Sequence, residues 1–219
     1  ERLPEPDVDR TAYTPAEVVR LFDSIELEDL HMGKHPGPLY WRTALLFFLD
    51  SGERSGALRK IRWDHYDPET GIVIVPAAIR KGQNKGATYH LRPQTRDGLR
   101  MMRMLDTTGE FIFGSWHFHE SNFFIRWRRI VKRAGLPVGQ RHSFHKLRRT
   151  FATWIELHGG DATLALLHGE RRTTEKSYLD ERQLAHVRKV QQPPLPDVLD
   201  ANYVSPFEDA NAAAEFKPM

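Results

Sequence analysis

The chain has 219 residues, enough to bury one sizeable core, and its longest apolar run, residues 44–49, is far too short to cross a membrane. It contains no cysteine, which excludes disulfides and thiolate metal sites and fits a reducing, cytoplasmic location. The net charge is only +3, but residues 31–190 hold 28 Lys or Arg against 15 Asp or Glu, which favours a polyanionic partner over a membrane.

The first predicted helix begins with a capping box. Thr14 is the expected cap, Pro15 suits the first turn, and Glu17 stands three residues after the cap. Apolar residues then recur at helical spacing, namely Val18, Leu21, Phe22 and Ile25.

A second helix is predicted over residues 41–49, after a loop around residues 33–38. The dipeptide Ser51-Gly52 breaks or bends the chain beyond it. Arg54 is therefore predicted at the start of the next helix.

Two short runs with strand character predict a β-hairpin. Residues 71–75 form the first strand, residues 87–91 alternate as the second, and residues 81–86 are the turn between them. Lys81 and Lys85 give this hairpin a basic tip.

The remaining pattern is helical. One helix begins near Arg96, and a second carries Phe123, Ile130 and Val131. The helix over residues 144–155 turns one apolar face to the core, with His145 and Arg148 as neighbours beside it. Residues 126–149, which include the first part of this helix, hold nine basic residues and no acid. Such a density attracts polyanions, although a basic face exposed to solvent is the ordinary alternative.

The last third of the chain carries two more residues with reactive side chains. A short helix through residues 164–167 leads to His168, and a further helix is predicted to carry Tyr178. Beyond residue 191 the sequence becomes acidic and proline-containing, as expected of a tail that packs on a surface or stays mobile.

Three segments share a further property. Residues 51–67 (SGERSGALRKIRWDHYD), 145–153 (HKLRRTFAT) and 166–178 (LLHGERRTTEKSY) resemble, in order, the two arginine boxes and the nucleophile segment of tyrosine recombinases of the phage-integrase type. The resemblance implies a mainly helical α+β catalytic domain with an antiparallel sheet of about three strands. It also implies DNA cleavage and rejoining through a 3′-phosphotyrosine without a metal or other cofactor.

The chemistry explains why these residue types belong together. A phosphodiester repels nucleophiles, so a metal-free enzyme needs fixed cations around the phosphate and a proton for the leaving oxygen. The resemblance implies that Arg54 and Arg148 clamp the phosphate, that Tyr178 attacks it, and that His145 and His168 bond to it. It assigns the proton donor to Lys81, with Lys85 as the alternative. The resemblance and the basic runs together give the expected DNA-binding residues as Lys85, Arg126, Arg129, Arg141, Lys146, Arg149, Arg171 and Arg172.

The sequence departs from the family pattern in three places. Ala57 stands three residues after the first arginine, where the family usually has an acid. Tyr178 lies ten residues after His168 rather than the usual nine, so Ser177 occupies the usual slot of the nucleophile. Either a one-residue bulge shifts the register, or a natural or engineered change has removed the nucleophile. We favour Tyr178, because a helix end can absorb one residue and a serine without its own base is a poorer nucleophile. Leu167 replaces the usual glycine before the last histidine.

Other functions fit parts of the pattern. The missing acid and the shifted tyrosine agree with a non-catalytic DNA-binding relative, and a type IB topoisomerase shares the phosphotyrosine chemistry. Several histidines invite a zinc hypothesis, but no converging ligand geometry is evident among His117, His119, His142 and His145.

The resemblance also suggests how the chain is divided. Residues 1–12 are expected to be a linker from a missing N-terminal DNA-binding domain, 13–190 the catalytic domain, and 191–219 the tail. Family members act as homotetramers on two double-stranded DNA sites, whereas the free fragment is expected to be a monomer with weak DNA binding.

Overall fold

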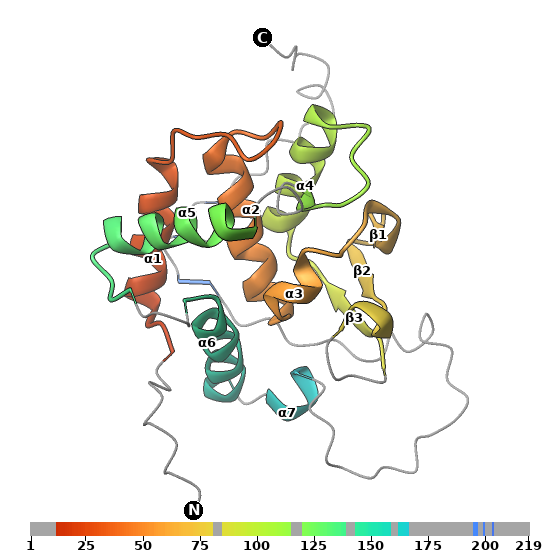
Figure 1. Cartoon of the computed structure of the whole chain (residues 1–219). Coiled ribbons are helices and arrows are strands. Elements are labelled where there is room, and N and C mark those ends of the chain that lie inside the picture. The colour runs from red at the N-terminus through yellow and green to blue at the C-terminus, as the bar shows by residue number, and fades with distance from the viewer. Residues whose placement is uncertain are drawn as a thin grey trace, which may run out of the picture.

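The protein is described by a computed structural model that covers residues 12–80, 85–114, 120–138, 143–158, 162–166, 195–196, 199 and 203. Within these residues the helices are α1 (Pro15–Glu26), α2 (Gly37–Ser51), α3 (Ser55–Leu58), α4 (Pro93–Leu105), α5 (Glu120–Arg133), α6 (Ser143–Leu157) and α7 (Ala162–Ala165). The strands β1 (Tyr66–Asp67), β2 (Ile72–Val75) and β3 (Ala87–His90) form one antiparallel sheet in that order. The predicted fold class, mainly helical with a small antiparallel sheet, is confirmed (Figure 1).

Helix α1 begins as the sequence predicts. The Thr14 hydroxyl accepts a hydrogen bond from the Glu17 backbone N–H at 3.2 Å, and the Glu17 carboxylate accepts one from the Thr14 N–H at 2.8 Å. This reciprocal pair satisfies two donors that a helix start would otherwise leave unpaired.

The sheet presents one buried face and one partly exposed face. In the β2–β3 pairing, Val73 lies opposite Tyr89 and Val75 opposite Ala87, and all four side chains are buried. The predicted hairpin is thus present among the described residues, with residues 81–84 of its turn outside them. The register matters for function because it directs Tyr89 inward.

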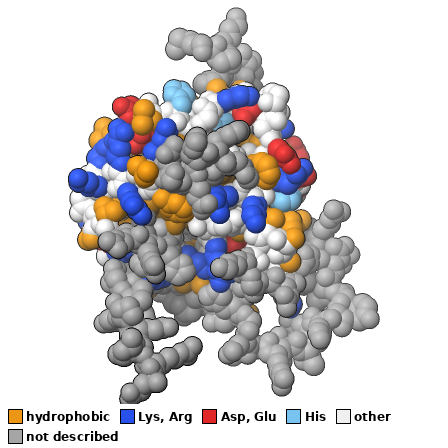
Figure 2. Space-filling view, viewed as in Figure 1, with side chains coloured by type: hydrophobic (Ala, Val, Ile, Leu, Met, Phe, Trp, Pro, Cys, Tyr) orange, Lys and Arg blue, Asp and Glu red, His pale blue; other side chains and the backbone are white. Residues whose placement is uncertain are grey.

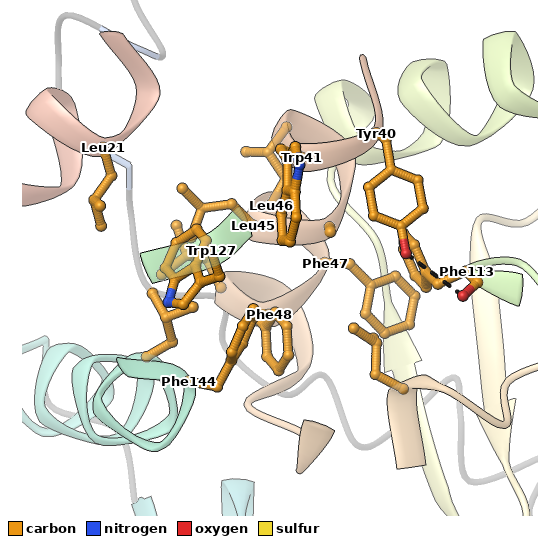
Figure 3. Close-up of a cluster of buried hydrophobic side chains, with 14 of the residues drawn as sticks. Leu21, Tyr40, Trp41, Leu45, Leu46, Phe47, Phe48, Phe113, Trp127 and Phe144 are labelled. Atoms are coloured by element: carbon orange, nitrogen blue, oxygen red, sulfur yellow. Dashed lines mark hydrogen bonds between the residues drawn. The ribbon is translucent and has the colours of Figure 1, made fainter. Parts of the chain in front are cut away.

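The core surrounds α2, which is buried over most of its length (Figure 3). Trp41 of α2 lies 5.8 Å from Trp127 of α5 between ring centroids, and Trp127 lies 4.8 Å from Phe144 of α6. On the other side of α2, the Tyr40 hydroxyl donates to the Phe113 carbonyl at 3.5 Å. Helices distant in sequence therefore meet on one aromatic cluster.

Helix α2 ends against α6 at a glycine that no other residue can easily replace. Gly52 has a φ of 57°, and a Cβ added to it would overlap the ring of Phe151. This close approach fixes where the next residues emerge, with Arg54 as the N-cap of α3, as predicted.

Described residues of the expected tail contact the domain, among them Leu199, which packs against the main core. Leu195 is 5% exposed and belongs to the main core, and the Tyr203 hydroxyl donates to the Asp97 carboxylate on α4. Across the described part of the chain, every helix is too short or too polar to span a bilayer.

Candidate functional site

Arg148 connects three segments that are far apart in the sequence. One terminal nitrogen of its guanidinium donates to the Gly52 carbonyl, and the other donates to the Leu166 carbonyl at 3.3 Å. Figure 1 shows the elements that carry these residues, α6 and α7 and the α2–α3 junction, on the same side of the molecule. Arg148 is only 4% exposed, so its guanidinium joins these segments from a buried position.

The charge of Arg148 is influenced by its neighbours. Burial lowers its pKa, the negative charge of Glu53 opposes this, and the positive charge of Arg54 adds to the lowering. Arg54 and Arg148 therefore lie close enough for their charges to interact. Two neighbouring guanidinium groups at one site are suited to bind a dianionic or monoanionic oxyanion in bidentate fashion.

A buried carboxylate belongs to the same junction. Glu53 is 1% exposed in its side chain, and its Oε1 accepts from Arg80 Nε at 2.5 Å and from the Tyr89 hydroxyl at 2.7 Å. Its Oε2 accepts from the backbone N–H of Arg54 at 3.2 Å. Burial raises the pKa of Tyr89 well above its usual value, and the Glu53 charge adds to that rise, so the phenol stays protonated as a donor.

Arg80 extends this network to the hairpin. Its side chain is 1% exposed, and besides Glu53 it donates to the Lys85 carbonyl at 3.0 Å. The two residues that flank positions 81–84 are thereby joined to each other and to the segment that precedes Arg54. We refer to Glu53, Arg54, Arg80, Tyr89 and Arg148 as the arginine cluster.

Of the residues predicted to act in catalysis, only Arg54 and Arg148 have described side chains, and the structure brings them together. His145 lies on α6, but its side chain is outside the described residues, as are Lys81, His168 and Tyr178. Their roles stay predictions.

The residues predicted to bind DNA divide into groups. The hairpin carries Lys85, and α6 carries Lys146 and Arg149, close in sequence to members of the arginine cluster. The Lys146 ammonium lies 4.5 Å from the centre of the Tyr13 ring. Arg126 and Arg129 of α5 contact the segment after α1 instead, through the His31 carbonyl and through Asp29 at 3.0 Å. Outside the described residues lie Arg141, Arg171 and Arg172.

Figure 2 shows how charge is distributed on one face. Lys and Arg side chains are spread across it, whereas most visible acids lie in its upper half. Surface pairs such as Arg129–Asp29 remain accessible to water and contribute little to stability, so a polyanion can compete for these cations.

Glu53, Arg80 and Tyr89 were not predicted as site residues. Tyr89 had a usable signal, because strand alternation over residues 87–91 places it on a buried face. Glu53 and Arg80 are 27 positions apart, and no local pattern pairs them.

The zinc hypothesis is not tested, since three of its four histidines and the side chain of the fourth lie outside the described residues. The described part alone holds no cluster of three His, Asp or Glu side chains suited to a metal.

The family model of the phage integrase family matches residues 12–183. The chain belongs to the phage integrase family. The match spans all three segments that carry the resemblance, so the family expectation from the sequence is confirmed. No curated protein sequence matches the chain.

Solved structures of tyrosine recombinases share the fold. XerA recombinase is 21% identical with a TM-score of 0.58 over 85% of this chain and 67% of its own. The lambda integrase tetramer bound to a Holliday junction is 20% identical, with a TM-score of 0.59 over 83% of this chain and 53% of its own. The Tn1549 transposon integrase bound to transposon right end DNA is 13% identical, with a TM-score of 0.59 over 84% and 67%. The chain thus spans about half to two thirds of these phage integrase relatives.

Proposed function

We propose that this chain is the catalytic domain of a site-specific DNA recombinase that cleaves and rejoins double-stranded DNA through a 3′-phosphotyrosine. One observation carries the proposal: Arg148 bonds to Gly52 and to Leu166, so the segments that resemble the two arginine boxes and the start of the nucleophile segment meet at one place. Family membership supports the same reading.

In the proposed reaction Arg54 and Arg148 bind the non-bridging oxygens of one phosphate and offset the charge that builds up during attack. The Tyr178 phenolate forms a bond to phosphorus, with His145 taking the phenol proton, while His168 bonds to the phosphate. The bond from phosphorus to the 5′ oxygen breaks, and Lys81 donates the proton that this oxygen needs. Rejoining runs the same steps in reverse, so no external energy source is required.

The assembly is part of the proposal. The lambda integrase relative is a tetramer on a Holliday junction, and we propose that this chain likewise acts as a homotetramer on two DNA sites. The free chain is proposed to be monomeric and to bind DNA weakly.

The test is incubation with suicide DNA that contains the native site, whose released short strand diffuses away and traps the covalent complex. We expect attachment, mapped by mass spectrometry to Tyr178, and its complete loss in Tyr178→Phe because the nucleophilic oxygen is removed. Ser177→Ala is the matched control and should still attach to DNA.

Each alternative gives a different result. Salt-sensitive DNA binding without any attachment would establish the non-catalytic reading. Attachment with relaxation of supercoiled plasmids that lack the site would establish a topoisomerase. Attachment at another residue would overturn the assignment of Tyr178.

A further inference from the structure

We propose that Glu53 is a positioning residue of this site: its buried carboxylate helps to hold Arg54 and Arg148 in the arrangement that binds a DNA phosphate. The inference rests on the proposed function and deepens it. Glu53 stands directly before Arg54, whereas the acid that the family usually has would stand at position 57, which is Ala57 in this chain.

The geometry of the carboxylate supports this role. Glu53 receives three hydrogen bonds, from the Arg80 guanidinium, the Tyr89 hydroxyl and the Arg54 backbone N–H, at 2.5, 2.7 and 3.2 Å. Three donors restrict the orientation of a buried carboxylate, because leaving any of them unpaired is costly. Because its partners come from β3, from the segment after β2 and from the start of α3, the carboxylate joins the sheet to the helix that begins at Arg54.

The charges of the residues around Glu53 also support a positioning role. The positive charges of Arg54 and Arg80 both act on Arg148, whose own charge is disfavoured by burial. Glu53 supplies a compensating negative charge among them. Removing one partner of such a buried pair leaves the remaining charges uncompensated, so the guanidinium groups move apart or turn toward water.

A positioning role predicts a change in anion affinity opposite to the one that the charge of Glu53 alone predicts. Glu53→Gln removes a negative charge from a basic site, which by itself would strengthen anion binding. If Glu53 positions the arginines, the same substitution weakens anion binding because the clamp loses its geometry. The direction of the change therefore separates positioning from a mere contribution to local charge.

The first measurement is titration of the chain with inorganic phosphate, followed through the ¹H–¹⁵N resonances of the arginine Nε–H groups. We expect Glu53→Gln to bind phosphate more weakly than the wild type, with smaller shifts at Arg54 and Arg148. Tyr89→Phe, which keeps the carboxylate and removes only one donor, should change affinity in the same direction by less. Equal or tighter phosphate binding in Glu53→Gln would overturn the proposal.

The matched control is Asp50→Asn. Asp50 also forms a buried ion pair, with Arg92, and accepts from the Thr95 hydroxyl at 2.6 Å, but its partners lie at the start of α4. Thermal unfolding establishes that each variant is folded. Asp50→Asn should lower the melting temperature while leaving phosphate affinity unchanged, and an equal loss of affinity in this control would reduce Glu53 to a structural role.

The second measurement is the rate of covalent attachment to suicide DNA. We expect Glu53→Gln to slow it by about 10- to 100-fold, the scale of a small misplacement of reacting groups. Its effect should combine with that of Arg54→Lys less than additively, since Glu53 holds the backbone that carries the Arg54 side chain, whereas Asp50→Asn should be additive. Additive effects for Glu53→Gln would contradict the proposal. If the wild type never attaches to DNA, the proposed function fails, while the phosphate titration still decides the role of Glu53.

Discussion

Gly52 is the residue on which the geometry of the arginine cluster depends most. Its carbonyl accepts from Arg148, its φ of 57° lies in the left-handed region, and a Cβ at this position would overlap Phe151 of α6. A side chain here would both strain the backbone and push α6, the helix that carries Arg148, away from α3.

We expect Gly52→Ala to lower the free energy of unfolding by about 1–3 kcal/mol, with the steric overlap adding to the backbone strain. Urea denaturation measures it. Gly56→Ala is the control, because a Cβ at Gly56 meets no atom within 4 Å and lies in helix α3. That variant should gain about 0.5–1 kcal/mol, as expected for glycine replaced within a helix. A Gly52→Ala variant as stable as the wild type would contradict the account of this junction.

Two members of the arginine cluster could be recognised from the sequence. Arg54 and Arg148 stand in recognisable segments, so their residue types and neighbours were informative. Glu53, Arg80 and Tyr89 act through a buried network whose members are separated by 27 and 36 positions. Such pairing depends on the sheet register and on the end of α2, which local patterns do not encode.

Among the elements, the start of α1 and the end of α2 at Ser51 were predicted well, whereas α2 and α4 begin at Gly37 and Pro93, a few residues before the predicted starts. The capping box of α1 is a local device, and it is present as the spacing indicated. Strand β1 has only two residues, Tyr66 and Asp67, and exists because β2 provides a pairing edge for it. A segment that short has no periodicity of its own, so its residues did not predict it.

The end of α4 is held by a second polar network. Asp106 accepts from the Lys34 ammonium at 2.9 Å and from the backbone N–H of Thr108 and of Gly109, which joins α4 to the loop before α2. The hydrogen bond from Lys34, together with those from Thr108, lowers the pKa of Asp106 to about 2 from 3.8.

This shift predicts a pH dependence of stability. A carboxylate with a lowered folded-state pKa stabilises the fold fully above its unfolded value, and that contribution is lost as the pH falls from about 4 through 2. We expect Asp106→Asn to be less stable than the wild type at neutral pH, with the difference shrinking between pH 4 and pH 2. Urea denaturation at a series of pH values checks this, and a constant difference across that range would show that the Asp106 charge adds nothing.

At the scale of the whole molecule, the uneven charge is the feature that the sequence showed most directly. Residues 31–190 carry the excess of Lys and Arg, and Lys and Arg side chains are spread across one face of the molecule (Figure 2). The sequence did not show that Arg126 and Arg129 contact the segment after α1, because this depends on how α5 crosses α1. A DNA contact by these two arginines therefore stays a prediction.

We propose that Arg54 and Arg148 bind the same DNA phosphate that Tyr178 attacks. The most direct measurement is a crystal structure of the Tyr178→Phe chain with duplex DNA that contains the native site, since we expect this variant to bind the intact phosphate without cleaving it. We expect one backbone phosphate within hydrogen-bond distance of both guanidinium groups, with the substituted aromatic ring at position 178 directed at the phosphorus. DNA bound on another face, with no phosphate at Arg54 and Arg148, would contradict it.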